Sequence, residues 1–280
     1  MLLTVNEKIV DSPASALSAL DRGFLLGDGV FETLRIYAGK PFKLDDHLTR
    51  LSDACARTSI RVSRGVESLT RREIERVGSI GLGEAIMRIT ISRGLGLGLG
   101  TDPDDSTVVT LIEPLPTLDP GWYERGLDVV IARGRRNEFS ETVGIKTTAY
   151  LDSIVAFRAA AQNGAADALF LDTRGHLSEA TASNLFVFNA GALHTPPLEC
   201  GAMPGITRSC VIEIAKTAGI TVDSQTPLDP AVLKTADEVF LTSSIREIVP
   251  VISCDGLRVG NGKPGAVTRR MITAYSEMTR

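Results

Sequence analysis

A proline-rich segment near the middle of the chain constrains its architecture most. Three prolines and one glycine occur in the run Glu113–Gly121. Proline and glycine interrupt both helices and strands, and a short cluster of them marks a turn or linker. The chain has 280 residues, which is enough for two modest domains with proper cores. We therefore predict an N-terminal domain over residues 1–113, a linker over 114–124 and a larger C-terminal domain over 125–280.

Strand-like and helix-like segments alternate irregularly on both sides of this linker. Alternating or β-branched residues predict strands over residues 1–10, 30–36, 86–92, 107–112, 127–132, 168–171, 185–188, 239–242 and 249–253. Apolar residues at helical spacing predict helices over residues 44–58, 66–77, 151–164, 207–218 and 267–278. Because these elements do not follow a strict strand–helix–strand repeat, the sequence favours an α+β fold in two domains.

Bulk properties exclude several classes of protein. The net charge is -4 and hydrophobic residues make up 43% of the chain, so we expect neither a nucleic-acid partner nor a disordered chain. We expect no membrane partner, because no apolar stretch reaches the roughly 18 residues of a membrane span. The four cysteines form no CxxC pair, which argues against a disulfide framework and a metal site. The start of the chain lacks a signal-peptide pattern, so we predict reduced thiols in a cytoplasmic protein.

Three segments have features of a phosphate site. Residues 203–208 place a Pro-Gly pair before a predicted helix, and the backbone N–H groups at a helix start attract anions. Residues 241–247 place hydroxyl groups directly after a predicted strand. Arg50 lies on a predicted helix, and arginine is a strong partner for phosphate. Taken alone, each feature is also typical of a helix cap, a polar loop or a surface arginine.

Two further residues have surroundings that suit covalent cofactor chemistry. Lys146 is flanked by apolar and hydroxyl side chains just before a predicted helix, and desolvation there would favour the neutral amine that a Schiff base needs. Glu179 lies among small residues ahead of an apolar strand, where its carboxylate could keep a pyridine nitrogen protonated. On their own, a structural lysine and a turn glutamate would explain both residues.

In their order along the chain, these segments resemble the fold-type IV pyridoxal 5'-phosphate (PLP) enzymes, the class IV aminotransferase family. The resemblance covers nearly the whole chain and rests on the motifs Gly27–Arg35, His47–Leu51, Lys146–Leu151, Gly175–Phe186, Pro204–Arg208 and Thr242–Val251. It implies PLP as the cofactor, an amino donor and a keto acid as substrates, and a homodimer. It also implies a smaller N-terminal α/β domain and a larger C-terminal domain that binds PLP.

The resemblance assigns roles to individual residues. Lys146 would carry the cofactor as a Schiff base, Glu179 would face its pyridine nitrogen, and Tyr150 would hydrogen-bond its phenolic oxygen. The phosphate would be held by Arg50, by the backbone N–H groups of Ile206 and Thr207, and by Ser243 and Ser244.

Three positions qualify this picture. Ala149 stands where family members often have asparagine, a departure that bears on the neighbouring Tyr150 and leaves Lys146 untouched. His47 is expected to be structural. The run Gly94–Gly100 lacks the following helix of a nucleotide-binding motif, and it resembles the family's flexible loop that reaches toward the partner subunit's active site.

Substrate discrimination is expected in the N-terminal domain. Phe31, Thr33 and Arg35 alternate along one predicted strand and therefore share a face. Arg88 is a lone charge in an apolar strand, and it matches the position where branched-chain aminotransferases carry an arginine near the substrate carboxylate. The alternative for Arg88 is a structural ion pair with Glu32.

The motifs leave more than one reaction open. The Arg-x-His carboxylate trap of D-amino-acid aminotransferases is absent. Thr33 stands where branched-chain enzymes usually have glycine, and Phe-Glu-Thr is common among 4-amino-4-deoxychorismate lyases, yet the glycine-rich run lacks the arginine of some lyases. We predict a PLP-dependent transaminase that moves an amino group between an amino acid or amine and a 2-keto acid. The alternatives are the lyase, which releases pyruvate and 4-aminobenzoate, and a non-catalytic binder of PLP or another phosphorylated ligand. The donor and its chirality stay open.

Overall fold

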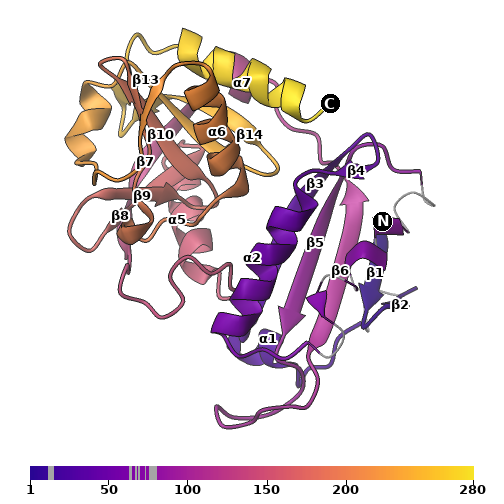
Figure 1. Ribbon diagram of the computed structural model, residues 1–280. Coiled ribbons are helices and arrows are strands. Elements are labelled where there is room, and N and C mark those ends of the chain that lie inside the picture. The colour runs from indigo at the N-terminus through magenta and orange to yellow at the C-terminus, as the bar shows by residue number, and fades with distance from the viewer. Residues whose placement is uncertain (12–15, 63–64, 67, 69, 73, 76–80) are drawn as a thin grey trace. The chain divides into compact units, whose positions relative to one another are not determined.

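The chain folds into two compact units in the computed structural model, which describes all residues except 12–15, 63–64, 67, 69, 73 and 76–80. The first unit consists of Met1–Pro116 and Ile145–Tyr150, and the second consists of Thr117–Gly144 and Leu151–Arg280 (Figure 1). The helix that the sequence predicts over residues 66–77 lies partly outside the described residues.

An antiparallel sheet with strand order β2-β1-β6-β5-β3-β4 forms the first unit's centre. Its strands are β1 (Leu2–Val5), β2 (Lys8–Ile9), β3 (Gly29–Tyr37), β4 (Lys40–Pro41), β5 (Ala85–Ser92) and β6 (Thr107–Pro114). The long strands β3 and β5 lie side by side, with Gly29 opposite Ser92 and Ile36 opposite Ala85. Alternate residues of β5 are buried, which is the period-two pattern from which this strand was predicted.

The helices α1 (Arg22–Leu26) and α2 (Leu44–Arg57) also belong to the first unit. Helix α2 confirms the predicted helix over residues 44–58. Its buried apolar side chains recur at helical spacing and pack onto the sheet. The core formed in this way includes Val30, Leu34, Ile36, Leu48, Leu51, Met87, Ile91 and Ile112.

The segment Ile145–Tyr150 returns to the first unit and pairs with the start of β3. The Phe31 N–H donates to the Lys146 carbonyl at 2.8 Å, and the Thr148 N–H donates to the Gly29 carbonyl at 2.9 Å. Strand β4 pairs with β3 only at Ile36 and Tyr37 among the described residues, so the other end of this edge is available for the segment. The prediction treated residues 125–280 as one continuous domain, and this return was not foreseen.

The second unit is built on a mixed sheet with strand order β12-β11-β10-β13-β14-β7-β8-β9, with β15 beside β14. The strands are β7 (Leu127–Arg136), β8 (Asp167–Asp172), β9 (Leu177–Ala180), β10 (Asn184–Asn189), β11 (Ala192–His194), β12 (Thr221–Asp223), β13 (Glu238–Ser243), β14 (Glu247–Cys254) and β15 (Leu257–Arg258). Strand β9 also pairs with β10 through Glu179 and Asn184. This pairing closes the strands from β10 round to β9 into a ring.

Helices and short turns complete the second unit. They are α4 (Gly121–Glu124), α5 (Leu151–Gln162), η2 (Leu198–Cys200), α6 (Ile206–Thr217), η3 (Pro230–Lys234) and α7 (Ala266–Met278). Helix α4 lies inside the segment predicted as the linker over residues 114–124. All residues of β8 are buried, and the rings of Phe186 and Phe240 stack with centroids 5.0 Å apart. The ring of strands is filled by apolar side chains from the alternate positions, among them Leu169, Leu185, Leu241 and Val249.

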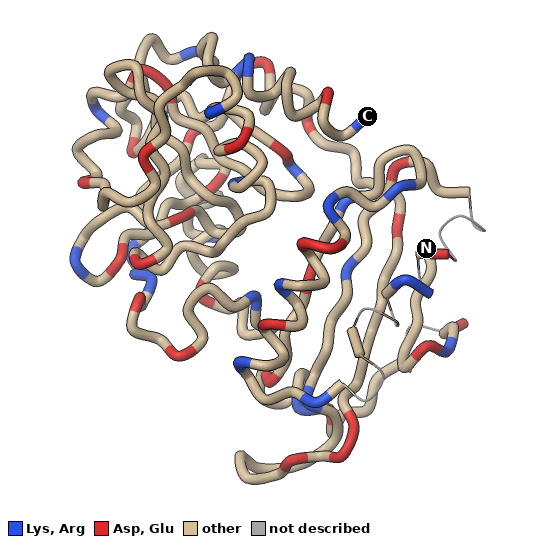
Figure 2. The backbone as a smooth tube through the Cα atoms, in the orientation of Figure 1, with Lys and Arg blue, Asp and Glu red and all other residues tan. Residues whose placement is uncertain are grey.

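Lys and Arg are interspersed with Asp and Glu along both units (Figure 2). The four cysteines are buried and free of disulfide bonds. Within the described ranges, no helix combines the length and apolar character needed to cross a membrane.

Candidate functional site

The amine of Lys146 lies against two aromatic rings in the first unit. Its Nζ atom is 4.6 Å from the ring centroid of Phe31 and 5.8 Å from that of Tyr150. The two rings contact edge to face, with centroids 5.7 Å apart. Phe31 is almost fully buried, and Lys146 is half-buried. These two rings shield part of the amine from water.

Arg88 approaches the same phenylalanine from β5. The guanidinium carbon of Arg88 is 3.7 Å from the ring centroid of Phe31, a close cation–π contact. Burial lowers the pKa of Arg88, although proximity to Tyr150 acts in the opposite direction. Thr33 is the residue directly opposite Arg88 in the strand pairing. The structure therefore gathers Lys146, Tyr150, Phe31, Thr33 and Arg88.

Arg35 occupies a different place from these residues. Its Nη2 atom forms an ion pair with Glu84 at 3.2 Å, and its guanidinium lies 4.5 Å from the ring centroid of Tyr37. Arg35 shares a face of β3 with Phe31. Its contacts with Glu84 and Tyr37, however, lie near the C-terminal end of β3.

Arg50 is fixed by a buried carboxylate on the other face of β3. Glu32 accepts hydrogen bonds from Arg50 Nε at 2.6 Å, from Arg50 Nη2 at 2.9 Å and from His47 Nδ1 at 2.8 Å. Burial alone would raise the pKa of Glu32, but the hydrogen bonds from His47 and Arg50 outweigh it and lower this pKa to about 2. Glu32 therefore pairs with Arg50 and His47, and the alternative ion pair with Arg88 is not formed.

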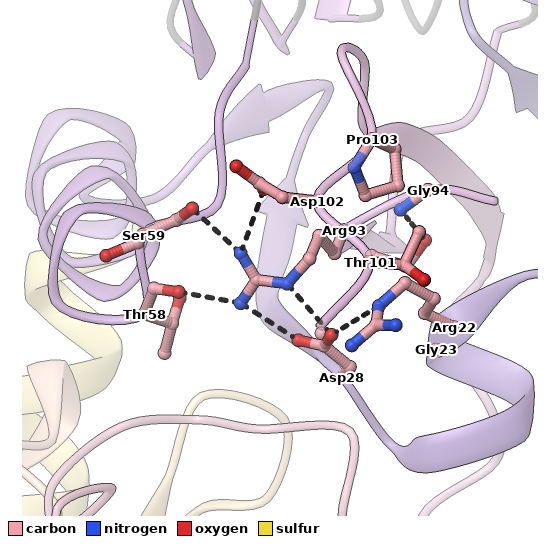
Figure 3. Close-up of polar contacts among 12 residues, drawn as sticks. Arg22, Gly23, Asp28, Thr58, Ser59, Arg93, Gly94, Thr101, Asp102 and Pro103 are labelled. Atoms are coloured by element: carbon pink, nitrogen blue, oxygen red, sulfur yellow. Dashed lines mark hydrogen bonds and ion pairs between the residues drawn. The ribbon is translucent and has the colours of Figure 1, made fainter. Parts of the chain in front are cut away.

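A second ion-pair network fixes the base of the glycine-rich run in the first unit (Figure 3). Arg93 binds Asp28 through Nε at 2.9 Å and Nη2 at 3.2 Å, and it donates to the carbonyls of Thr58 and Ser59. Arg22 binds the same Asp28 carboxylate at 2.8 Å. These contacts join the start of β3, the end of α2 and the end of β5. This network could not be predicted from the sequence, because nothing local to Arg93 marks a partner so far along the chain.

Glu179 is held from two sides in the second unit. Its Oε2 atom accepts a hydrogen bond from the Met203 N–H at 2.8 Å, and its Oε1 atom lies 3.1 Å from Arg136 Nε. The Nε–H of Arg136 does not point at the carboxylate, so this contact is an ion pair without a hydrogen bond. The guanidinium of Arg136 also lies 4.1 Å from the ring centroid of Phe170. Sequence reasoning missed Arg136, which stands at the end of a strand among other arginines.

The helix start predicted as an anion site lies next to Glu179. Ile206 and Thr207 are the first residues of α6, and Gly205 precedes them as N-cap. Asn184 donates to the Met203 carbonyl at 2.8 Å. A side chain at Gly205 would meet this asparagine, because an added Cβ would lie 1.9 Å from its Oδ1 atom. The first N–H groups of a helix are not used by the helix's own hydrogen bonds, so the start of α6 is suited to an anion.

The loop that contains Ser243 and Ser244 lies next to the same region of the second unit. Asn184 is the register partner of both Glu179 and Thr242, so Ser243 follows directly on this junction of β9, β10 and β13. Ser243 Oγ accepts a hydrogen bond from the Arg246 N–H at 3.1 Å. Ser244 is half-buried in this loop.

Arg246 stabilises the loop that contains Ser243 and Ser244. Its Nη2 atom binds the fully buried Asp167 at 2.6 Å and donates to Ser183 Oγ at 2.9 Å. The sequence placed Arg246 in a motif but gave neither it nor Asp167 a role.

The comparisons agree on one family. The model of the family described as amino-transferase class IV matches residues 29–254. One relative is a Methanocaldococcus jannaschii protein that is provisionally named a branched-chain-amino-acid aminotransferase. It is 34% identical to this chain over 282 residues, and the match covers 99% of this chain and 96% of that protein. The Escherichia coli branched-chain amino acid aminotransferase structure has a TM-score of 0.92 and 30% identity, covering 99% of this chain and 93% of its own.

Two further solved structures bear on cofactor and reaction. The T.th. branched-chain amino acid aminotransferase with pyridoxamine 5'-phosphate has a TM-score of 0.91 and 26% identity, and the match covers 99% of this chain and 94% of that one. The 4-amino-4-deoxychorismate lyase of Pseudomonas aeruginosa has a TM-score of 0.86 and 29% identity, and the match covers 99% and 98%. All of these matches extend over both units.

Proposed function

Because this chain belongs to the class IV aminotransferase family and is a transaminase of fold type IV, we propose that it binds PLP through Lys146 and transfers the amino group of a branched-chain amino acid to a 2-keto acid. The observation that carries the proposal is the contact of the Lys146 amine with Phe31, whose ring also contacts Arg88. A nucleophilic amine and a cation suited to a carboxylate therefore share one aromatic neighbour.

The donor groups of the chain fit PLP. Lys146 offers an amine in aromatic surroundings for the aldehyde carbon, and Glu179 offers a carboxylate with a fixed position for the pyridine nitrogen. The first turn of α6, with a glycine required at its N-cap, suits a phosphate group. In this proposal Tyr150 holds the phenolic oxygen, and Arg50, Ser243 and Ser244 contribute to the phosphate site.

Bound PLP would supply an electron sink for the carbanion that forms when the substrate loses its α-proton. The chain's own residues supply the proton transfers and the positioning. Lys146 Nζ, in its neutral form, takes the α-proton of the amino donor, and in the second half of the cycle it gives a proton to the α-carbon of the keto acid. Phe31 and Tyr150 limit the water around Nζ.

Glu179 would keep a proton on the pyridine nitrogen. Its carboxylate is oriented by the Met203 N–H, and the Arg136 guanidinium lies beside its other oxygen. An oriented anion is needed here because the positive charge that it stabilises increases the cofactor's capacity to accept electrons. Arg136 acts through Glu179 and is therefore a positioning residue.

Arg88 would receive the substrate carboxylate. Its guanidinium is half-buried and stacks on Phe31, which leaves its edge as the part that can form two parallel hydrogen bonds. Phe31 and Thr33 would line the space for the side chain of the substrate. A branched-chain donor is supported by the names of the relatives and by this aromatic lining.

The lyase is the second candidate function. It is supported by the likeness to the lyase of P. aeruginosa and by Thr33 after Phe31 and Glu32. Purified holoenzyme should be given leucine, isoleucine or valine with 2-oxoglutarate, and separately 4-amino-4-deoxychorismate. We expect glutamate to form in the first assay. Release of pyruvate and 4-aminobenzoate in the second assay, without glutamate in the first, would replace transaminase by lyase.

A homodimer is part of the proposal. The exposed apolar side chains Phe24, Leu97 and Leu99 of the first unit support a covering partner, with 74%, 66% and 88% of their surfaces accessible in the single chain. Light scattering coupled to size-exclusion chromatography would test it, and a monomer mass would reject it. A cytoplasmic location belongs to the same proposal and rests on the cysteine pattern of the sequence.

A further inference from the structure

Asp172, His176 and Cys200 form a cluster of metal-binding side chains in the second unit. One ligand atom of each residue lies within 4.8 Å of the others. Asp172 Oδ2 is 3.2 Å from His176 Nδ1. Asp172 and Cys200 are fully buried, whereas the side chain of His176 keeps 34% of its surface accessible. The proposed transaminase chemistry uses none of these residues.

Backbone N–H groups hold Asp172 in place, and its side chain contacts both the imidazole of His176 and the thiol of Cys200. Strand β8 ends at Asp172, and the chain turns back into β9 after His176. Asp172 Oδ1 accepts hydrogen bonds from the backbone N–H groups of Arg174 at 3.0 Å and His176 at 2.8 Å. These bonds leave Oδ2 facing the imidazole. Cys200 ends η2, and Gly201 follows it in the left-handed conformation at a φ of 82°.

The charges around the cluster suit a dication. Arg174 lies 3.4 Å from Asp172 and 3.3 Å from the Glu138 carboxylate, and Glu138 also accepts from Thr173. Two carboxylates and one guanidinium leave a single negative charge. A divalent ion that displaces the proton of the Cys200 thiol would make the whole group neutral. Neutrality matters here because a net charge at buried groups is costly.

We propose that Asp172 Oδ2, His176 Nδ1 and Cys200 Sγ bind one Zn²⁺ ion, with water as the fourth ligand. Zinc takes carboxylate, imidazole and thiolate ligands in tetrahedral sites, whereas Mg²⁺ and Ca²⁺ prefer oxygen alone. Binding converts the Cys200 thiol to a thiolate and releases one proton to solvent. The proton on His176 Nδ1 moves to Nε2 through solvent, which the exposed part of the ring makes accessible.

Bound zinc would also affect the structure around Glu179. His176 precedes Glu179 along the chain into β9, and Cys200 precedes Met203 along the chain toward α6. The Met203 N–H donates to Glu179. Zinc would therefore tie together the same two segments that this hydrogen bond joins. We expect a higher unfolding temperature for the protein when zinc is bound.

Zinc titration of the PLP-loaded enzyme, freed of metals with a chelator, tests the proposal. Calorimetry in buffers of different ionisation enthalpy should give one ion per chain and about one proton released. The variants Cys200→Ser and His176→Gln should bind zinc more than about 100-fold more weakly, since even residues behind metal ligands contribute 10–100-fold. Cys210→Ser removes a buried thiol from α6 and is the matched control. Its affinity should equal that of the wild type.

Arg174→Ala should change the zinc affinity in the direction opposite to the ligand variants. Arg174 competes with zinc for Asp172, so its removal should tighten zinc binding while the ligand variants weaken it. Retained cofactor absorbance establishes that each variant is folded. If Cys200→Ser does not fold, His176→Gln on the partly exposed turn carries the test. Equal zinc affinity in the wild type, the ligand variants and Cys210→Ser would overturn the site, as would no bound zinc in the wild type.

Discussion

The guanidinium of Arg88 lies 3.7 Å from the ring centroid of Phe31, and the amine of Lys146 lies 4.6 Å from the same centroid. Two cationic side chains from separate segments therefore meet at one ring. A carboxylate held by the Arg88 guanidinium would therefore lie close to the amine of Lys146. The first two predictions test these two side chains.

Arg88→Leu should raise KM for amino acids and keto acids and spare primary amines that lack a carboxylate. The expected loss in kcat/KM for carboxylate substrates is about 2–4 kcal/mol, as for removal of one side of a buried charged pair. Steady-state kinetics with matched acid and amine donors measures this difference. Arg35→Leu is the control, because Arg35 pairs with Glu84. Equal losses for both kinds of donor would assign Arg88 to the fold or the cofactor.

Lys146→Ala should lose both the Schiff-base absorbance and turnover, because no other group then attaches the cofactor. Borohydride reduction of the wild type, followed by peptide mapping, should place the reduced adduct on Lys146. Lys216→Ala, which changes an exposed lysine of α6, should keep both properties. A reduced adduct on another lysine would contradict the assignment.

Glu179→Gln should keep PLP bound and slow the removal of the substrate's α-proton by about tenfold or more, which is about 1.4 kcal/mol in the barrier. Glutamine still accepts the Met203 N–H but cannot balance a protonated pyridine nitrogen. Single-turnover absorbance changes after addition of donor measure this step. Arg136→Met keeps the carboxylate and the packing on Phe170, so its effect should be smaller. An unchanged rate in Glu179→Gln would remove this residue from the mechanism.

Ile206→Pro should weaken PLP binding by roughly ten- to a hundredfold, because it removes one N–H donor to a charged group. Proline fits the first position of a helix, and the preceding Gly205 has the extended ψ of 136° that proline requires. Ile206→Ala keeps the N–H group and serves as control. Cofactor dissociation constants can be measured by fluorescence or absorbance titration. The same loss in both variants would point to packing rather than phosphate binding.

The pH dependence of stability should reveal Glu32. Its pKa is lowered from the ordinary value of 4.5 to about 2 in the folded protein, so the stabilisation is fully present above pH 4.5. It is lost as pH falls toward 2, and the loss is on the order of 3 kcal/mol. Denaturant unfolding at several pH values should show this decrease. Glu32→Gln should flatten it, and Glu124→Gln, a change to an exposed carboxylate, should not.

Arg50→Ala combines two effects because of this carboxylate. It removes a candidate phosphate contact and also leaves Glu32 with one partner fewer in a buried position. We therefore expect lower stability of the first unit together with weaker cofactor binding. The family resemblance assigned Arg50 only to the phosphate.

Local patterns predicted the elements well, because they are set by neighbours along the chain. Helix α2 matches the predicted range 44–58, and α5 (Leu151–Gln162) matches 151–164 to within its end. The fold class followed from the mixture of these elements and from the family resemblance. Helix α6 begins at Ile206, one residue before the predicted start, with Gly205 as its cap.

Contacts between distant segments could not be predicted in the same way. The pairing of Arg136 with Glu179 and the bonds of Arg93 to Asp28 both join residues that no short motif connects. No local pattern encodes such partners, since each side chain alone is compatible with a solvated position. The return of Ile145–Tyr150 to β3 is also a contact between segments that lie far apart in the sequence.

That return has a consequence for how the protein is made. Domains generally fold in order as the nascent chain emerges, with the N-terminal one first. Here the ribosome must release residues 117–144 of the second unit before Ile145–Tyr150 can complete the edge of β3 in the first. A truncated polypeptide that ends at Pro116 would lack this piece. The first unit therefore cannot finish folding cotranslationally until synthesis has passed Tyr150.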